Sequence, residues 1–481
     1  MSAPDLIEPL ALPPVDVVVV GAGLAGLTAA LDLQQAGLRV RVLEAAPQAG
    51  GRLRRTRLDW PGGGTWVDLG GQWVGPTQTR MLARLNQAGL ERFPSPHDGK
   101  TVLHYSGERC TFDSYFQGFP EGEAPAVPQE AWDDAMQALA RFNALAASLP
   151  VDRPPQTASG AEALDRIPFQ DWIAANTRTA FGRWYFAYFC RAVGFLGPAE
   201  PEEVSLLHVL WGQRTAPEAE HPEEELIHGG AGALLPHLLA ELGEGTVQLG
   251  QPVLRILEHS GFTMPSWPVL VDSDTARHPC RAVIVAMPPS QAARIAFTPE
   301  LPPDRRALQG GMTMGRCAKV LIAYDSPWWR SKGLSGLAIG DRPTLESCTD
   351  SSDPRGTAGV LATFVVGHRH RAWSALEAGG RRQAVLDDLV AYFGPQAATP
   401  RAYLEQDWTQ EPFVGGAYAA WMPPGLWSAA GDALRRPHGR VHWAGTEAAT
   451  RWAGFFDGAV RSGEDAAGKV RRRLEAEEQA G

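Results

Sequence analysis

Val17-Val18-Val19-Val20-Gly21-Ala22-Gly23-Leu24-Ala25-Gly26 lies near the start of the 481-residue chain and decides its fold class. The valines predict a buried strand, and the apolar pattern after Gly26 predicts a helix, so the glycines occupy a strand-to-helix turn. We expect Gly21 to permit the tight turn and Gly23 to let the backbone approach a pyrophosphate at the helix N-terminus. Gly26 would let the helix pack closely on the strand.

A second strand and an acid follow at the spacing that this turn requires. Val40-Arg41-Val42-Leu43-Glu44 places a carboxylate 18 residues after Gly26, where it can accept hydrogen bonds from a ribose 2′-hydroxyl. A lone Gly-x-Gly-x-x-Gly is a weak motif, but here the strand, the helix and the acid agree. We therefore predict a dinucleotide site in a βαβ unit over residues 15–45. The alternative is an ordinary glycine-rich turn.

Net charge and cysteine content indicate what kind of partner, metal site and compartment to expect. The net charge is −10, which argues against a nucleic-acid-binding face and favours a small-molecule partner. The cysteines are odd in number and contain no Cys-x-x-Cys spacing, so we expect no metal site and a reducing compartment. They are Cys110, Cys190, Cys280, Cys317 and Cys348.

The sequence also bears on location. The residues before Val15 include Asp5, Glu8 and several prolines, a composition unlike that of a signal peptide. No run of 18 apolar residues predicts a membrane span. We therefore expect a cytoplasmic protein.

Several later segments predict strands that return to the first sheet. These are residues 247–257, 269–272 and 281–289. Residues 130–212 read mainly as helices, and residues 300–400 alternate strands with a helix near 381–393. The nucleotide-binding domain is therefore expected to be discontinuous along the chain.

Over nearly its whole length the chain resembles the flavin-dependent monoamine oxidase family, part of the FAD amine oxidases. The stretch Gly70-Gly71-Gln72-Trp73 is most similar to soluble bacterial members. The motifs that carry the resemblance are Gly21-x-Gly23-x-x-Gly26, Gly50-Gly51-Arg52, Asp68 to Gln78, Lys319, Trp408, Gly415-Gly416-Ala417-Tyr418 and Gly445-Thr446-Glu447 to Gly458.

The resemblance implies an α/β fold with two domains. One is a discontinuous, Rossmann-like FAD-binding domain, expected over residues 1–93, 220–300 and 401–481. The other is a substrate domain of mixed sheet and helices, expected over residues 94–219 and 301–400.

The resemblance also implies which residues bind FAD. Arg52 suits this role because a guanidinium can bridge phosphate or ribosyl oxygens, although a surface ion pair is the alternative. Glu447 is expected to open the last helical segment, where a carboxylate could instead serve only as a helix-start residue. The full set is Gly21, Gly23, Gly26, Glu44, Arg52, Gly70, Gly71, Gln72, Val253, Gly445, Glu447 and Phe456.

One departure concerns the attachment of the flavin. Some family members place a cysteine that bonds to the flavin after Gly-Gly and before Tyr, and this chain has Ala417 there. We therefore predict FAD held without a covalent bond.

Catalytic roles follow from the same resemblance. Tyr418 and Phe455 match two rings that flank the amine, and Trp408 matches a tryptophan beside the flavin. Lys319 lies in an otherwise apolar strand, where a buried ammonium needs a partner or a function. The resemblance assigns it a water at flavin N5 and a part in the reaction with dioxygen. The alternative is an edge lysine that reaches solvent.

The implied reaction is oxidative deamination of a small primary amine, with dioxygen as acceptor and hydrogen peroxide as a product. A di- or polyamine oxidase would need a deep acid such as Glu346 or Glu223, and an L-amino acid oxidase would need an arginine clamp. A pigment desaturase and a non-catalytic flavin protein are more distant alternatives. The predicted partners are the amine and dioxygen, with a homodimer left open. The expected pocket residues are Trp73, His228, Glu346 and Ser347.

Overall fold

The computed structural model describes residues 10–113, 127–193, 197–216, 223–259 and 264–480. Residues 1–9, which contain the acids used to argue against a signal peptide, lie outside this set. No helix within the described ranges combines the length and the apolar character needed to cross a bilayer.

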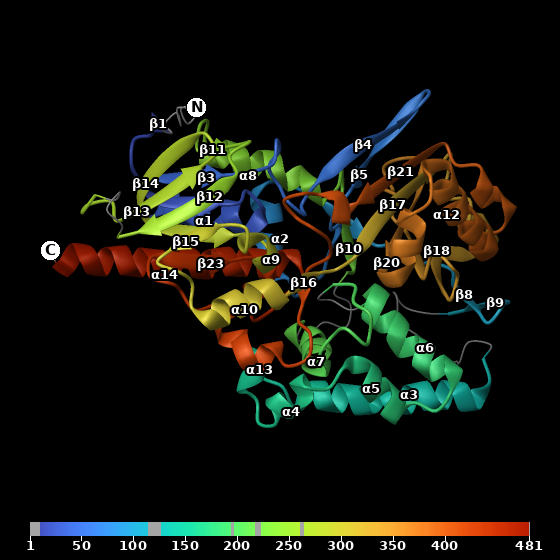
Figure 1. The fold of residues 1–481 in the computed structure, drawn as a ribbon. Helices are drawn as coiled ribbons and strands as arrows, with labels where there is room; N and C mark the ends of the chain where they lie inside the picture. Colours follow the sequence, from blue (N-terminus) through green and yellow to red (C-terminus); the bar gives the residue numbers. More distant parts are fainter. Residues whose placement is uncertain (1–9, 114–126, 194–196, 217–222, 260–263, 481) are drawn as a thin grey trace, which may run out of the picture.

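A nine-stranded sheet forms one half of the molecule (Figure 1). Strand β2 (Val15–Val20) pairs in parallel with β3 (Val40–Leu43) and β14 (Ala276–Ala286). Val17, Val18 and Val19 are fully buried, as expected in a sheet covered on both faces. The opening βαβ unit is thus present. The strand order is β11 (Val247–Gln248), β3 (Val40–Leu43), β2 (Val15–Val20), β14 (Ala276–Ala286), β13 (Val269–Ser273), β12 (Val253–Glu258) and β15 (Ala296–Thr298), and β14 also pairs with β1 (Leu10–Ala11) and β23 (Val441–Ala444).

The segment 247–257 is not one strand, as the sequence pattern predicted, but two. β11 pairs with β3 at one edge of the sheet, whereas β12 pairs with β13 and β15 toward the other edge. Gly250 between them has φ +65°, and Pro252 follows it, so the chain leaves the extended conformation there. Between the two strands the chain therefore runs from the β3 edge of the sheet toward the opposite edge, where β13 and β15 lie.

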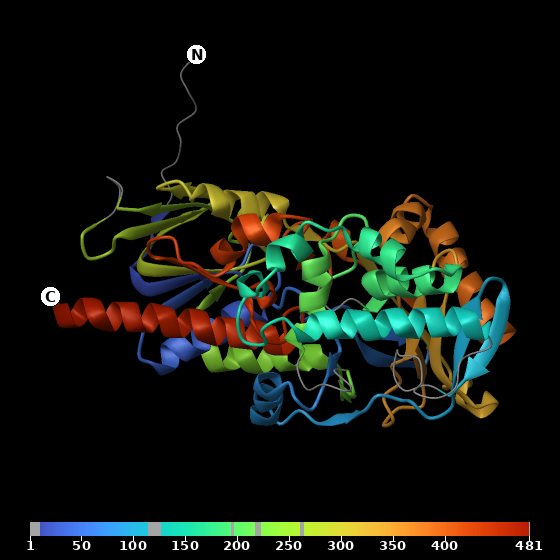
Figure 2. The ribbon, with the colours of Figure 1, turned by 90° about the horizontal axis from the view of Figure 1, so that it is seen from below.

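Helices from both ends of the chain lie side by side against this sheet (Figures 1 and 2). They are α1 (Leu24–Gln35) and α14 (Phe456–Ala480). A Cβ atom added at Gly463 would lie 2.4 Å from the carbonyl oxygen of Ala25, so a glycine allows the two helices to approach closely. Helices α2 (Thr79–Gln87) and α8 (Leu234–Leu242) pack against α14 and α1 respectively.

A seven-stranded sheet forms the other half (Figure 1). Along β17 (Cys317–Tyr324), alternate residues such as Val320 and Ile322 pack in the core that helix α12 (Ala378–Phe393) covers, while Cys317 and Leu321 pack on the opposite side. Lys319 lies between Cys317 and Leu321 at the same two-residue spacing, so its side chain is on their face of the sheet. The order is β21 (Ala402–Asp407), β17 (Cys317–Tyr324), β20 (Gly359–Val366), β19 (Ser347–Asp350), β18 (Leu334–Gly340), β8 (Lys100–Tyr105) and β9 (Glu108–Phe112), with helices α11 (Gly367–Ser374) and α12 (Ala378–Phe393).

Strand β21 corrects one expected domain boundary. The predicted boundary at residue 401 assigned residues 402–407 to the FAD-binding domain, but β21 pairs with β17 from Ala318↔Asp407 to Ala323↔Ala402. These residues belong to the second sheet because they complete its edge beside β17.

A layer of helices packs below both sheets in Figure 1. In the view from below, one of them, α3 (Gln129–Ala147), lies toward the viewer (Figure 2). The core of this layer is aromatic: the ring of Phe142 lies 5.9 Å from Phe169 and 5.6 Å from Trp172, centroid to centroid. The helices are α3 (Gln129–Ala147), α4 (Ala161–Asp165), α5 (Phe169–Asn176), α6 (Ala180–Tyr188), α7 (Leu206–Thr215) and α13 (Leu426–Ala430).

The first turn of α1 generates a stability prediction. A Cβ atom at Gly26 would lie 2.0 Å from the carbonyl oxygen of Gly21 and 3.2 Å from Cβ of Ala286, so Gly26→Ala must displace the helix from the sheet. We expect a loss of roughly 1–3 kcal/mol in the free energy of unfolding, measured by denaturant titration.

Gly310→Ala is the matched control, because Gly310 is helical and its added Cβ would meet nothing within 4 Å. We expect this variant to unfold at the wild-type denaturant concentration or slightly above it. Equal effects of the two substitutions would contradict the packing argument.

Candidate active site

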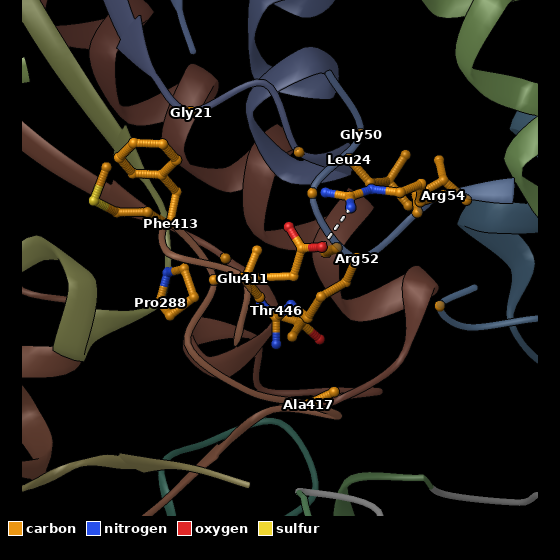
Figure 3. A pocket seen from close by; sticks show the side chains of 18 of the residues that line it. Gly21, Leu24, Gly50, Arg52, Arg54, Pro288, Glu411, Phe413, Ala417 and Thr446 are labelled. Atoms are coloured by element: carbon orange, nitrogen blue, oxygen red, sulfur yellow. Dashed lines mark hydrogen bonds and ion pairs between the residues drawn. The ribbon is translucent and has the colours of Figure 1, made fainter. Parts of the chain in front are cut away.

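One cavity of about 420 Å³ is lined by residues from both sheets. Figure 3 shows part of this lining, including Gly21, Arg52 and Ala417. The cavity brings together most of the residues predicted from the sequence, although they come from distant parts of the chain. The predicted residues that line it are Gly21, Gly23, Glu44, Arg52, Gly70, Gly71, Gln72, Trp73, Val253, Lys319, Ser347, Trp408, Ala417, Tyr418, Gly445, Phe455 and Phe456.

The glycine turn opens onto this cavity. Gly21 has φ +103°, a conformation that favours glycine, and Gly23 is the N-cap of α1. A Cβ atom at Gly23 would meet no protein atom within 4 Å, so this face of the turn adjoins open space. The α14 N-terminus also reaches the cavity through Phe456. Two helix N-termini beside an exposed backbone turn suit the pyrophosphate of a dinucleotide.

Gly26 has the structural role that was predicted for it. It does not line the cavity, and its close approach to Gly21 allows α1 to lie against the sheet. This packing keeps the turn at the helix N-terminus in place.

Glu44 lies at the end of β3 and lines the cavity, near Gln251 and Val253 in the same lining. Its carboxylate accepts hydrogen bonds from the backbone N–H groups of Ala22 (2.7 Å) and Ala46 (2.8 Å). Burial raises the pKa of Glu44, and these hydrogen bonds oppose that shift. The carboxylate thus ties the glycine turn to the end of the second strand.

Arg52 joins three segments that are far apart in the sequence. Its Nη1 donates to Oε1 of Glu447 and to the carbonyl oxygen of Tyr418, both at 2.7 Å, and its Nη2 donates to Oε2 of Glu447 at 3.3 Å. Although burial alone would raise the pKa of Glu447, the charge of Arg52 holds it below its ordinary value. The Arg52 side chain is only partly exposed, so the surface ion-pair alternative does not describe it.

Glu447 differs from its prediction in position and in contacts. It lies in a short 3₁₀ helix, Thr446–Ala448, whereas the last helix begins at Phe456. It is buried behind Arg52 and does not line the cavity. Its effect on a ligand would therefore be exerted through Arg52.

Arg54 and Glu411 are site residues that sequence reasoning missed. Nη1 of Arg54 donates to Oε1 of Glu411 at 2.9 Å, and the guanidinium lies 5.3 Å from the ring centroid of Trp408 (Figure 3). Both residues line the cavity. No motif marks this pair, because the two partners are 357 positions apart.

Gly70 and Gly71 allow the loop after β5 (Gly63–Asp68) to pass close to its neighbours. A Cβ atom at Gly70 would lie 1.9 Å from the carbonyl oxygen of Arg52, and one at Gly71 would lie 2.6 Å from the ring of Phe456. Nε1 of Trp408 donates to the carbonyl oxygen of Leu69 at 3.0 Å. These contacts hold the loop against the rest of the cavity wall.

Lys319 is buried and faces the cavity from the middle of β17. Its Nζ donates to the carbonyl oxygen of Gly70 at 2.8 Å and to Oε1 of Gln72 at 2.5 Å. Burial lowers the pKa of Lys319 to about 8, although the carboxylates of Asp68 and Glu223 oppose the shift. The lysine is therefore a buried, hydrogen-bonded group and not an edge residue that reaches solvent.

Tyr418 and Phe455 line the same cavity as Lys319. The Oη atom of Tyr418 donates to the carbonyl oxygen of Ala192 at 3.3 Å, and its ring lies edge-on to Phe364, with centroids 5.5 Å apart. Phe364 is opposite Lys319 in the β17–β20 register. Sequence reasoning missed Phe364 because a phenylalanine within an apolar strand has no distinguishing signal.

The structure places His228 and Glu346 outside the cavity lining, contrary to expectation. Nδ1 of His228 lies 2.9 Å from Oδ1 of Asp353. Glu346 is buried and pairs with Arg191, so its charge is already compensated. Glu223 does line the cavity, and burial raises its pKa to about 7 although the charge of Lys319 opposes the shift.

No group of three or more His, Cys, Asp or Glu side chains able to hold a metal occurs in the ranges that the structure covers. The five cysteines are all free thiols. One of them, Cys317, is buried and lines the cavity beside Lys319.

Several known proteins are similar to this chain over nearly its whole length. The chain is 51% identical over 452 residues to an L-amino acid dehydrogenase of Synechocystis sp., covering 94% of each chain. It is 33% identical to a putrescine oxidase of Kocuria rosea, covering 95% of each. Cyclohexylamine oxidase from Brevibacterium oxydans superimposes with a TM-score of 0.87 at 32% identity, covering 96% of this chain and 100% of that one. The model of the flavin containing amine oxidoreductases matches residues 24–471, and the chain belongs to this family.

Proposed function

We propose that this enzyme oxidises a primary amine to an imine at a bound FAD, and that water then hydrolyses the imine. The observation that carries the proposal is that Lys319, Tyr418 and Phe455 line one cavity with the glycine turn of α1. When bound, FAD supplies the acceptor for a hydride equivalent and the route by which electrons reach dioxygen. The protein's task is then to bind, orient and desolvate the amine.

The residues present fit FAD. The open face of Gly23, the N-termini of α1 and α14, and Arg52 suit its phosphates and ribityl chain, and Glu44 suits a ribose hydroxyl. Gly445, Gln72, Val253 and Trp408 complete the proposed cofactor contacts.

The substrate end of the cavity must favour the neutral amine. With a pKa of about 10.4, an alkylamine is only about 0.1% neutral near pH 7.4. Tyr418, Phe455, Trp73 and Phe364 line this cavity with aromatic surface, which disfavours the charged form by desolvation. Tyr418 and Phe455 would flank the amine so that its carbon–hydrogen bond points at the flavin.

An L-amino acid is the second candidate substrate, because the Synechocystis relative is named for that activity. An amino acid needs a cation for its carboxylate. The arginines among the described lining residues already donate to protein acceptors: Arg52 to Glu447, Arg54 to Glu411 and Arg294 to the carbonyl oxygen of Pro412. Because Arg52 is assigned to FAD, and Arg54 and Arg294 already have protein partners, the cavity favours a simple amine over an amino acid.

A diamine would use Glu223 as the partner of its second ammonium. Of the two acids considered from the sequence, Glu223 lines the cavity and Glu346 does not. Because one relative is named putrescine oxidase, the test includes diamines.

The test is anaerobic mixing of the purified holoenzyme with monoamines, diamines and L-amino acids while flavin absorbance is followed. We expect monoamines to bleach the flavin and air to restore it with release of hydrogen peroxide. Bleaching by L-amino acids alone would establish the second candidate, and recovery only with an added quinone or dye would identify a dehydrogenase. A flavin that none of these compounds reduces would overturn the proposal.

Flavin attachment can be tested separately. Ala417 lines the cavity where some relatives in the family have the bonding cysteine, so we expect denaturation in acid to release all the FAD and leave protein of unmodified mass. Flavin that stays with the precipitate would contradict this expectation. Cys317→Ala would then show whether the other lining cysteine forms the bond.

Lys319 should govern the reaction with dioxygen. Its ammonium can stabilise negative charge that develops on oxygen, so Lys319→Met should slow reoxidation of the reduced enzyme by roughly 10²-fold. The wild-type rate should fall as pH rises through about 8, where Lys319 loses its proton, and the variant should lack this step.

Stopped-flow reoxidation across pH 6.5–9.5 measures both effects, since this range extends roughly 1.5 pH units to each side of the Lys319 pKa of about 8. Lys332→Met is the control, because Lys332 does not line the cavity. An unchanged rate in Lys319→Met would remove Lys319 from the proposed chemistry.

A further inference from the structure

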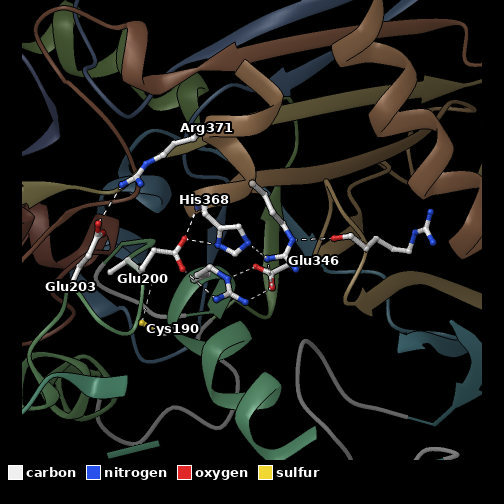
Figure 4. Close-up of polar contacts among 10 residues, drawn as sticks. Cys190, Glu200, Glu203, Glu346, His368 and Arg371 are labelled. Carbon is white, nitrogen blue, oxygen red and sulfur yellow. Dashed lines mark hydrogen bonds and ion pairs between the residues drawn. The ribbon is translucent and has the colours of Figure 1, made fainter. Parts of the chain in front are cut away.

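A buried cluster of charges lies outside the cavity lining, next to residues that belong to it (Figure 4). Nε and Nη2 of Arg191 donate to Oε2 and Oε1 of Glu346 at 2.9 and 2.7 Å, a two-bond pair. Nη1 of Arg191 also donates to Oε2 of Glu200 at 3.4 Å, and Nη1 of Arg369 lies 3.1 Å from Oε1 of Glu346. The side chains of Arg191 and Glu346 are only 8% and 1% exposed.

Each charge in this cluster has an opposite partner. Two guanidinium groups, of Arg191 and Arg369, meet two carboxylates, of Glu200 and Glu346. Although burial opposes it, hydrogen bonds from His368 and the charge of Arg191 lower the pKa of Glu200 to about 2. A planar, two-bond arginine–carboxylate pair is more directional than an ordinary ion pair.

The cluster is joined to the cavity through the next residue on each chain segment. Arg191 lies in a π-helical segment, Phe189–Val193, and is followed by Ala192, which lines the cavity and accepts the hydrogen bond from Tyr418. Glu346 is followed by Ser347, the first residue of β19, which also lines the cavity. One ion pair therefore connects two walls of the site.

A glycine allows this arrangement. Gly367, the first residue of α11, has φ +56°, and a Cβ atom there would lie 2.3 Å from Oε1 of Glu200 and 3.1 Å from Cδ of Arg191. The backbone N–H of His368 donates to Glu200 at 2.5 Å. The cluster is thus packed against a helix end as well as between two cavity walls, which leaves it little room to shift.

We propose that Arg191 and Glu346 are positioning residues for the substrate: their pair sets the separation of Ala192 and Ser347, and with it the orientation of Tyr418. This inference rests on the proposed function, because Tyr418 is taken to flank the amine. The pair determines how tightly a small amine is held and how far a bulkier amine is excluded. It touches neither the substrate nor the flavin.

The decisive comparison is between single variants and a charge-balanced double variant. Arg191→Met and Glu346→Gln each unbalance the charge of the buried cluster, because each removes one of its two guanidinium groups or one of its two carboxylates, and should lower the melting temperature, whereas the double variant should recover much of that loss. If the pair positions the wall, the double variant still has a raised KM for benzylamine, roughly 10-fold above wild type, with kcat changed less than about two-fold. Selectivity for benzylamine over naphthylmethylamine should fall by a similar factor. A double variant that recovers both stability and KM would overturn the proposal.

Arg191→Lys provides a second test should the other variants fold poorly. It keeps the charge but loses the two-bond geometry, so we expect a melting temperature near that of wild type with the same rise in KM. A wild-type KM in this variant would also overturn the proposal.

Hydrogen exchange gives a readout that does not depend on turnover. We expect the backbone amides of residues 189–193 to exchange faster in Glu346→Gln and in the double variant. Asp272→Asn is the control, because Asp272 is a buried carboxylate paired with Arg255 at 2.6 Å in the other sheet, and it should leave this segment and KM unchanged. Unaltered exchange in Glu346→Gln would overturn the positioning role. A wild-type flavin that no amine reduces would instead overturn only the proposed function.

Discussion

The ion pair between Arg52 and Glu447 is the interaction on which the rest of the site depends. It links the Gly50-Gly51-Arg52 turn with the Gly445-Thr446-Glu447 turn, and the same guanidinium holds the carbonyl oxygen of Tyr418. The loop at Gly70 then rests on the Arg52 backbone, and Phe456 rests on Gly71. Four distant segments of the chain thereby form one wall, and the approaches at Gly70 and Gly71 require glycines because a Cβ atom would occupy the contact.

Charge burial is the second constraint. Lys319, Arg52 and Arg191 are all cations in regions of low exposure, and each is held by directed hydrogen bonds to carbonyl or carboxylate oxygens. An unpaired charge in such places would cost several kcal/mol, so these partners are part of the fold as much as of the site. For Lys319, burial also lowers the pKa to about 8, which brings its titration close to physiological pH.

Short-range sequence patterns were sufficient to predict the parts of the site that depend on local backbone conformation. The glycine turn, the strand before it and Gly26 behave as predicted, because their spacing is set by the geometry of a single βαβ unit. Pattern was insufficient where a contact joins distant segments. Glu346 and His228 have the right chemistry for a pocket but pair elsewhere, and Glu447 acts behind Arg52. Arg54 and Phe364 had no local signal at all.

The sequence by itself determined the α/β class, the flavin family and most residues that line the cavity, because these follow from short-range spacing and from motifs that keep their order along the chain. Only the tertiary structure decided that β11 and β12 are separate strands, that β21 completes the second sheet, and which of the two candidate acids, Glu223 or Glu346, lines the cavity. The physical reason is that a carboxylate is neutralised by whichever cation the fold brings within a few ångströms. That distance is a property of packing between segments far apart in the chain, as in the pairs Arg52–Glu447 and Arg191–Glu346, whose members are 395 and 155 positions apart.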